Sequence, residues 1–178
     1  MKQLYILLFL SVVLLTSCKD NVELTFDNPT KNILTLKLDT LSVTIPSKDL
    51  LKIEIEKGEH QLILENDSVI KFNFIDLEYF INPSLSKYLV SEEYFGPEQF
   101  AENFTSKISR KEVSFLGMTL HGNYDIIKDA IHRVTWDFGP REILPKKVDV
   151  EEDQTYASRI KVYDVDEFMD VFLKTENN

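Results

Sequence analysis

The stretch LKIEIEKGEHQLIL, residues 51–64, alternates apolar and polar residues on both sides of a lysine–glycine pair. Alternation with a period of two predicts strands that bury one face and expose the other. Lys57-Gly58 predicts the turn that joins the two strands. This stretch therefore indicates a β fold in which one face of each strand packs and the other is wet.

Four further alternating stretches lie on either side of this one: residues 22–26, 32–38, 41–45 and 69–74. Turn residues such as Asp27-Asn28-Pro29 and Asn66-Asp67 separate the stretches. Six short strands at a spacing of about ten residues are typical of an antiparallel sandwich or barrel. We therefore predict a β-sandwich-like subdomain over residues 22–95.

Gly96-Pro97 is the strongest interruption in the middle of the chain and marks the expected boundary between two subdomains. The second subdomain, residues 96–178, is also rich in strand patterns. Strands are expected on both sides of Gly117, which predicts a bulge or bend, and over residues 156–163. Residues 124–133 fit either one helix face, at Ile126, Ile127, Ala130 and Ile131, or two strands joined by a turn at Lys128-Asp129, and the strands are favoured.

The clearest helix pattern lies near the end of the chain, over residues 165–174. Its apolar residues recur at the spacing of one helix face: Val165, Phe168, Met169, Phe172 and Leu173. Asp164 is a typical N-cap, and Glu167 three residues later gives a capping-box-like start. The predicted fold class is thus mainly β (α+β), with a sandwich-like N-terminal part and a β-rich C-terminal part that ends in one amphipathic helix.

Charge and cysteine content narrow the classes of function. Thirty acidic and 20 basic residues give a net charge of −10, which excludes nucleic acid as a partner because phosphate binding needs a basic surface. Cys18 is the one cysteine, so the folded body has none for a disulfide, a thiolate metal ligand or a nucleophile. Its stability is expected to come from a packed core.

The N-terminus has the pattern of a targeting segment. Lys2 supplies a positive charge, residues 4–15 are almost entirely apolar, and Thr16-Ser17 are small. This arrangement predicts a signal peptide over residues 1–17, because the apolar run is shorter than the roughly 18 to 20 residues of a membrane-spanning helix. An ordinary secretory leader would leave Cys18 as a stray thiol.

Leu15-Thr16-Ser17-Cys18 resembles the lipobox of bacterial lipoproteins, in which an aliphatic residue and two small residues precede a cysteine. The resemblance implies cleavage between Ser17 and Cys18, a diacylglycerol on the Cys18 thiol and a second acylation at the new amino terminus. Residues 18–21 would then be a lipidated tether. The lipid bilayer, through acylated Cys18, is the first expected partner, and the expected location is the cell envelope, on the outer membrane, with surface exposure left open.

The turn at residues 53–60 and the strand after it resemble the small β-sandwich, PEGA-like domains of envelope proteins. The shared features are a glycine turn followed by a histidine or polar residue and then an alternating strand. Domains of this kind bind or space other parts, and they rarely catalyse. The resemblance implies a non-enzymatic module.

The candidate chemical motifs are weak. His60, His121 and His132 lack the spacing of a helical zinc site, so they are expected in surface or core positions. The glycines at 117 and 122 are not followed by the lysine that a phosphate-binding loop needs. The sequence also lacks the G-x-S-x-G nucleophile elbow of a hydrolase. The acidic run at residues 149–153 predicts a solvated face, with a weak cation site as the alternative. No metal, cofactor or enzymatic activity is expected.

Aromatic residues offer the remaining candidate contacts: Tyr79, Phe80, Tyr88, Tyr94, Phe95 and Trp136. Core packing is the favoured role, and stacking on a sugar or a protein partner is the alternative. Trp136 is the candidate ligand contact because it lies at a predicted strand end beside a loop. The sequence favours an envelope lipoprotein that binds an unknown envelope protein or glycan, or instead an acidic, immunity-type inhibitor that masks a basic protein.

Overall fold

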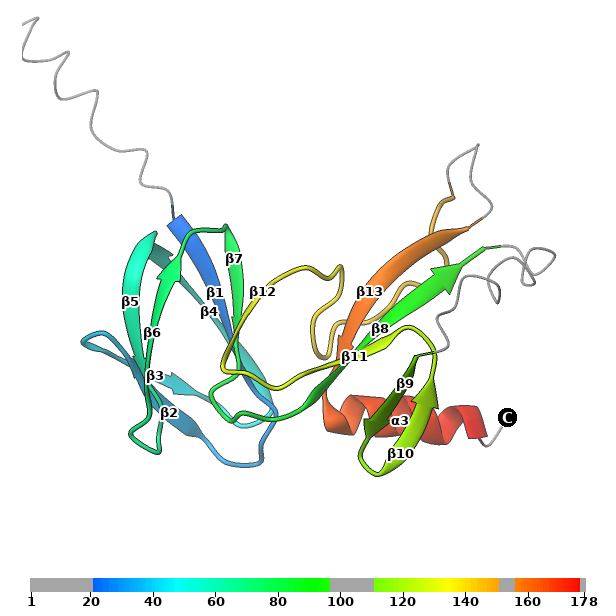
Figure 1. The fold of residues 1–178 in the computed structure, drawn as a ribbon, viewed down its shortest axis with the longest axis horizontal. Helices are drawn as coiled ribbons and strands as arrows, with labels where there is room; N and C mark the ends of the chain where they lie inside the picture. The colour runs from blue at the N-terminus through cyan, green and yellow to red at the C-terminus, as the bar shows by residue number, and fades with distance from the viewer. Residues whose placement is uncertain (1–20, 97–110, 151–155, 177–178) are drawn as a thin grey trace, which may run out of the picture.

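The computed structural model describes residues 21–96, 111–150 and 156–176 (Figure 1). The predicted signal peptide, the predicted cleavage site at Ser17 and the predicted lipidation site at Cys18 lie outside these residues. The described elements are β1 (Asn21–Asn28), β2 (Leu34–Leu38), β3 (Leu41–Ile45), β4 (Asp49–Glu56), β5 (Gly58–Ile63), β6 (Val69–Phe74), β7 (Glu78–Ile81), β8 (Tyr88–Phe95), β9 (Glu112–Phe115), β10 (Met118–His121), β11 (Tyr124–Ile127), β12 (Ile131–Arg133), β13 (Ala157–Tyr163) and α3 (Val165–Glu176). The mainly β fold class with one C-terminal helix is confirmed.

The N-terminal part is a sandwich of two four-stranded sheets (Figure 1). One sheet has the strand order β12-β7-β1-β4 and the other has the order β3-β2-β5-β6. The neighbouring strands in these two sheets are antiparallel, except that β1 and β7 run parallel. β12 joins this sandwich from the second half of the chain, because it pairs with β7.

Alternating apolar side chains fill the space between the two sheets. On β2, Leu34, Leu36 and Leu38 are buried while Thr35 and Lys37 are exposed, as the period-two pattern predicts. Burial of each such leucine contributes about 1.5–3 kcal/mol. The same core takes in the fully buried Val22, Leu24 and Phe26 of β1.

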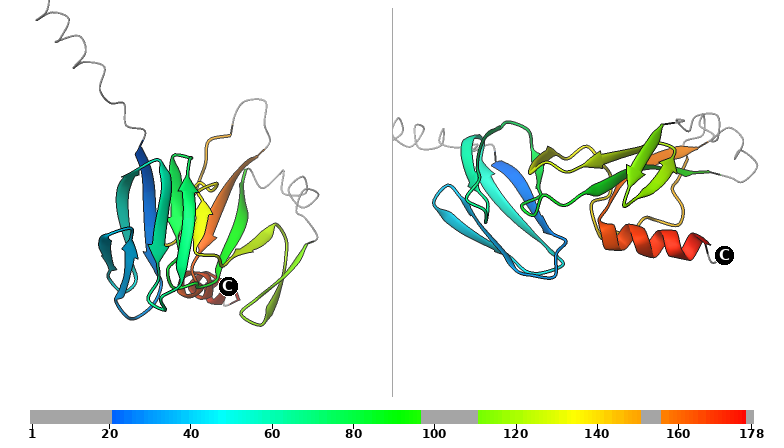
Figure 2. Two further views of the ribbon diagram at one scale, coloured as in Figure 1. Left: turned by 60° about the vertical axis from the view of Figure 1, so that its left-hand side comes forward. Right: turned by 60° about the horizontal axis from the view of Figure 1, so that its bottom comes forward.

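The C-terminal part has a three-stranded antiparallel sheet of order β11-β8-β13 and the hairpin β9–β10. α3 packs on one face of this part (Figure 2, right). Phe168 of α3 contacts Phe115 of β9 edge to face. The sequence places the strand Tyr88–Phe95 before the boundary at Gly96, whereas its hydrogen bonds go to β11 and β13. Tyr88 and Leu89 are both fully buried, because β8 packs against apolar side chains on both faces.

Gly117 lies in a tight turn and not in a bulge or bend within a strand. Leu116 and Gly117 both have positive φ, 52° and 80°, and they connect β9 to β10. Two consecutive residues with positive φ match the twist of antiparallel strands in a two-residue hairpin. The expectation of a bulge or bend is corrected to a hairpin turn.

α3 begins where the sequence pattern predicts. The backbone N–H of Glu167 donates to Asp164 Oδ1 at 2.8 Å, which makes Asp164 the N-cap. The carboxylate of Glu167 does not complete a reciprocal capping box, because it binds Lys161 Nζ at 2.7 Å and accepts from the Arg141 N–H at 2.9 Å. Within the described segments, no helix has the length and apolar character needed to cross a membrane.

Candidate functional site

Trp136 lies at the seam between the sandwich and the C-terminal sheet. Its indole ring meets Phe80 of β7 edge to face, with ring centroids 5.5 Å apart. Phe80 in turn packs against Tyr88 of β8 at 5.2 Å. Trp136 is half-buried: it packs against this cluster and also lines an open cleft. The structure therefore gives Trp136 a packing role and a surface that faces solvent space.

The cleft beside Trp136, called here the Trp136 cleft, has a volume of about 140 Å³. Its apolar walls include Phe80, Val134 and Trp136. The charged side chains that line it are four carboxylates and one ammonium group: Glu23, Glu78, Asp137, Glu142 and Lys52. Aromatic and carboxylate groups together suit a ligand that donates hydrogen bonds, such as an amine, a guanidinium or a sugar hydroxyl.

Lys52 neutralises only part of the negative charge of the cleft. Its Nζ lies 2.6 Å from Glu23 Oε1. The hydrogen bond to Glu23 is the main cause that raises the pKa of Lys52, and the negative charges of Glu78 and Glu142 add to the effect. An excess of negative charge thus remains along the cleft.

Two other carboxylates of the cleft, those of Asp137 and Glu142, accept hydrogen bonds from the backbone. Glu142 Oε2 accepts from the Gly139 N–H at 2.7 Å, and Asp137 Oδ2 accepts from the Ile160 N–H at 2.8 Å. Asp137 also lies 4.0 Å from the guanidinium of Arg159. These bonds fix the positions of the acids without consuming all their acceptor sites.

Gly139 keeps the cleft open. A Cβ atom at this position would lie 3.7 Å from Trp136 Nε1 and 3.7 Å from Glu142 Oε2, which is ordinary van der Waals contact. The backbone of Gly139 does not have the left-handed φ that requires glycine. A side chain at this position would therefore occupy the cleft without straining the backbone.

A buried ion pair between Asp27 and Arg141 crosses the seam. Asp27, at the end of β1, is fully buried, and the guanidinium of Arg141 pairs with it. The same guanidinium binds Asp164 Oδ2 at 2.7 Å, and the Tyr88 hydroxyl donates to Asp27 Oδ2 at 2.7 Å. Burial raises the pKa of Asp27, and Arg141 and the Tyr88 hydroxyl oppose that shift.

Lys161 adds a second buried charge to this seam. Its side chain is 1% exposed, and its Nζ contacts Gly139 O at 2.6 Å, Val162 O at 2.9 Å and Glu167 Oε1 at 2.7 Å. The three acceptors match the three donors of an ammonium group. Burial lowers the pKa of Lys161, and Glu167 opposes that shift. Because all three N–H donors of the ammonium are used, Lys161 holds the backbone at Gly139 in place and has no donor left for a ligand.

The sequence interpretation missed this network. Asp27 stands in a turn-like Asp-Asn-Pro sequence, and the N-cap role alone explained Asp164. Lys161, between the apolar residues Ile160 and Val162 of a strand, was the available signal, because lysine is almost never fully buried unless it is paired. Arg141 carries no local signal of its role.

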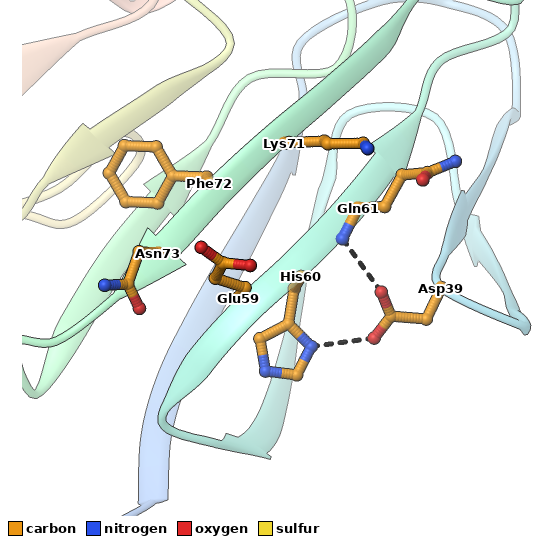
Figure 3. Close-up of a pocket in the computed structure, with 7 residues that line it drawn as sticks. All are labelled: Asp39, Glu59, His60, Gln61, Lys71, Phe72 and Asn73. Carbon is orange, nitrogen blue, oxygen red and sulfur yellow. Dashed lines mark hydrogen bonds and ion pairs between the residues drawn. The ribbon is translucent and has the colours of Figure 1, made fainter.

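His60 belongs to a shallow pocket on the β2–β5–β6 sheet (Figure 3). Its Nδ1 lies 2.7 Å from Asp39 Oδ2, and its Nε2 lies 2.9 Å from Glu56 O. Asp39 Oδ1 accepts from the Gln61 N–H at 2.8 Å, and the hydrogen bond to His60 is the main cause that lowers the pKa of Asp39. The pair fastens the β2–β3 turn to β5, and the side chains that line the pocket offer no hydroxyl or thiol nucleophile.

The other predicted candidates lie apart from one another. His121 of β10 lies 3.5 Å from Glu112 of β9. His132 of β12 lies 3.0 Å from the carbonyl oxygen of Asp129. Because His60 is on β5, the three histidines belong to three different sheets. Among the side chains that the structure describes, no group of three or more His, Cys, Asp or Glu is placed to hold a metal ion. Residues 151–153 of the acidic run lie outside the described segments.

Comparisons of the chain with models of protein families, with curated proteins and with solved structures find no match. The chemistry of the Trp136 cleft is then the guide to a ligand. The cleft combines an aromatic ring, fixed carboxylates and open volume at the junction of two β parts.

Proposed function

We propose that the chain is a lipid-anchored lipoprotein of the cell envelope that acts as a non-enzymatic binding module, with the Trp136 cleft as its ligand site. The observation that carries the ligand site is the meeting of half-buried Trp136 with four carboxylates in one cleft. The lipobox at residues 15–18 supports the anchor, which is expected to sit in the outer membrane.

The bonding of the acids favours binding over acid–base catalysis. Glu23 is paired with Lys52, and Glu142 is held by the backbone of Gly139. Glu23, Asp137 and Glu142 therefore each have a structural partner that fixes an acceptor direction, as a recognition surface requires. A glycan would stack on the aromatic wall and donate hydroxyl hydrogens to the carboxylates.

The charge of the cleft supports a second candidate, an acidic inhibitor or immunity-type lipoprotein that masks a basic protein. Four carboxylates against the single ammonium of Lys52 make the cleft electrostatically complementary to a lysine or arginine side chain. Trp136 would add a cation–π contact to such a side chain. The two candidates differ in how binding responds to salt.

Replacement of Cys18 by alanine tests the anchor. Cys18→Ala is expected to abolish labelling by radioactive fatty acid and partition into membranes, while circular dichroism still reports a folded β body. Lipid raises membrane affinity by about 0.8 kcal/mol per buried methylene, so its loss should move the protein to the soluble fraction. A Cys18→Ala protein that still floats with membranes would overturn the anchor.

Capture from envelope extracts at 50 mM and 500 mM salt tests the cleft, with Trp136→Ala compared with Trp136→Phe and the unmodified protein. We expect Trp136→Ala to lose the captured species and Trp136→Phe to keep part of it, because an aromatic ring remains. Retention of a glycan at high salt supports the first candidate, and loss of a basic protein at high salt supports the second. Unchanged capture by Trp136→Ala would remove the cleft as the site.

A further inference from the structure

The loop between β6 and β7 holds two large apolar side chains out of the body. Ile75 is 64% exposed and Leu77 is 69% exposed. Phe74, which precedes this loop, and Tyr79, the second residue of β7, are 1% and 3% exposed and belong to the sandwich core. The pair Ile75 and Leu77 is called here the apolar lip.

Hydrogen bonds hold the apolar lip in a fixed shape. The backbone N–H groups of Ile75 and Asp76 both donate to the Tyr79 hydroxyl oxygen, at 3.3 and 3.2 Å. Asp76, between the two apolar residues, accepts from the Tyr79 hydroxyl at 3.1 Å and pairs with Arg133 at 3.3 Å. The carboxylate is thus tied to the body, and the apolar side chains beside it stay in solvent.

The apolar lip lies at the end of the molecule where the chain enters the sandwich. The Glu23 N–H donates to Leu77 O at 2.8 Å, and β1 begins at Asn21 (Figure 1). Cys18 precedes Asn21 by three residues, and three residues span at most about 11 Å. Acyl chains on Cys18 would therefore hold this end of the body next to the bilayer.

We propose that the apolar lip seats in the headgroup boundary of the bilayer that anchors the chain, an inference that rests on the lipid anchor proposed above. A short tether gives the bilayer a high effective concentration at this end, which makes two apolar side chains sufficient for a contact. A stable protein interface of about 800 Å² per partner needs far more surface than two side chains supply.

The charges around the apolar lip specify the kind of lipid surface. Glu78 is exposed directly after Leu77, and Glu54 accepts from Asn21 Nδ2 at 3.2 Å at the start of β1. Arg133 is paired with Asp76, so the carboxylates of Glu54 and Glu78 remain to repel anionic headgroups, and the lip suits a zwitterionic surface. Because Glu23 and Glu78 also line the Trp136 cleft, seating of the lip brings one end of the cleft beside the membrane.

A fluorescent probe at position 77 tests this orientation in the full lipidated chain. Leu77→Cys provides a single reactive thiol once Cys18 is consumed by lipid, and it takes a nitrobenzoxadiazole label. Val69→Cys is the matched control, because Val69 is a 53% exposed residue at the opposite end of β6. Both proteins are reconstituted in phosphatidylcholine vesicles, with and without brominated acyl chains.

We expect the label at position 77 to shift to shorter wavelength and to be quenched by brominated lipid several-fold more than the label at position 69. Equal quenching at the two positions in protein that floats with the vesicles would contradict membrane contact by the apolar lip and would leave the proposed lipid anchor intact. A wavelength shift without quenching would place the loop against protein and would also overturn it. Protein that fails to float with the vesicles would contradict the proposed lipid anchor and, with it, membrane contact by the apolar lip.

Discussion

The hydroxyl of Tyr88 on β8 donates a 2.7 Å hydrogen bond to the buried carboxylate of Asp27 at the end of β1. The bond joins the first strand of the sandwich to the central strand of the C-terminal sheet. Arg141 binds the same carboxylate and reaches on to Asp164, the N-cap of α3. The two halves of the chain are therefore connected by buried charges as well as by apolar contacts.

Tyr88→Phe removes the hydroxyl and leaves Asp27 with Arg141 alone. The loss of one hydrogen bond to a charged group is expected to lower the free energy of unfolding by about 1.5–3 kcal/mol. Urea unfolding followed by the fluorescence of Trp136, the single tryptophan at the seam, measures this change. Tyr124→Phe is the matched control, with an expected change within about 0.5 kcal/mol. Equal effects of the two variants would contradict a special role for the Tyr88 hydroxyl.

Lys161→Met removes the buried ammonium, so Gly139 O, Val162 O and Glu167 Oε1 lose the hydrogen bonds that it donates. Breaking a buried ion pair from one side costs about 3–5 kcal/mol. We expect a loss of this size in urea unfolding, and a coupling between Lys161→Met and Glu167→Gln in a double-mutant cycle. Additive effects of the two substitutions would show that the pair does not stabilise the seam.

Period-two patterns made the sandwich strands predictable. Leu34, Leu36 and Leu38 alternate with polar residues, and burial follows that alternation. The strand order was not predictable, because the parallel contact between β1 and β7 joins residues more than fifty positions apart without any local turn. The place of β8 was hidden for another reason: Tyr88 and Leu89 are neighbours in sequence and both are buried, so no alternation marks its two packed faces.

The residues of the candidate site were also predictable only where a local sequence pattern marked them. Trp136 could be selected from its place beside a loop, and Asp137 and Glu142 lie near it in the sequence, but Glu23 of β1 and Glu78 of β7 reach the cleft from strands that no local pattern links to it. Asp27 has the sequence context of an exposed turn, and its partner Arg141 lies 114 residues away. Local chemistry identifies a residue type, and the tertiary fold decides whether a charge is buried.

Asp39 gives the stability a defined pH dependence. The hydrogen bond to His60 lowers the pKa of Asp39 below its ordinary value of 3.8 in the folded state. A carboxyl group with a lowered folded-state pKa contributes stability above its unfolded pKa and loses it as pH falls through the folded pKa. The advantage of the unmodified protein over Asp39→Asn should therefore be present at pH 7 and shrink below about pH 4. Urea midpoints measured from pH 7 to pH 2 check this.

Asp27→Asn is the informative comparison for Asp39, because burial raises the pKa of Asp27. A carboxyl group with a raised folded-state pKa contributes most to the free energy of unfolding at pH values below its unfolded pKa. This contribution declines as pH rises through the folded pKa. The pH profile of the difference between the unmodified protein and Asp27→Asn should thus slope in the opposite direction. Two slopes of the same sign would contradict the proposed electrostatic roles.

Gly139→Leu tests the Trp136 cleft by filling it. A leucine at this position places its side chain between Trp136 Nε1 and Glu142, where a Cβ atom fits at 3.7 Å, and the backbone needs no left-handed φ. We therefore expect the urea midpoint to change little and the capture of the partner to fall at least tenfold, a change of about 1.4 kcal/mol in binding free energy. Gly139→Ala is the matched control, because a single methyl group leaves most of the cleft open. If Gly139→Leu binds the partner as tightly as Gly139→Ala does, the ligand does not enter beside Trp136 and the contact must lie on another face.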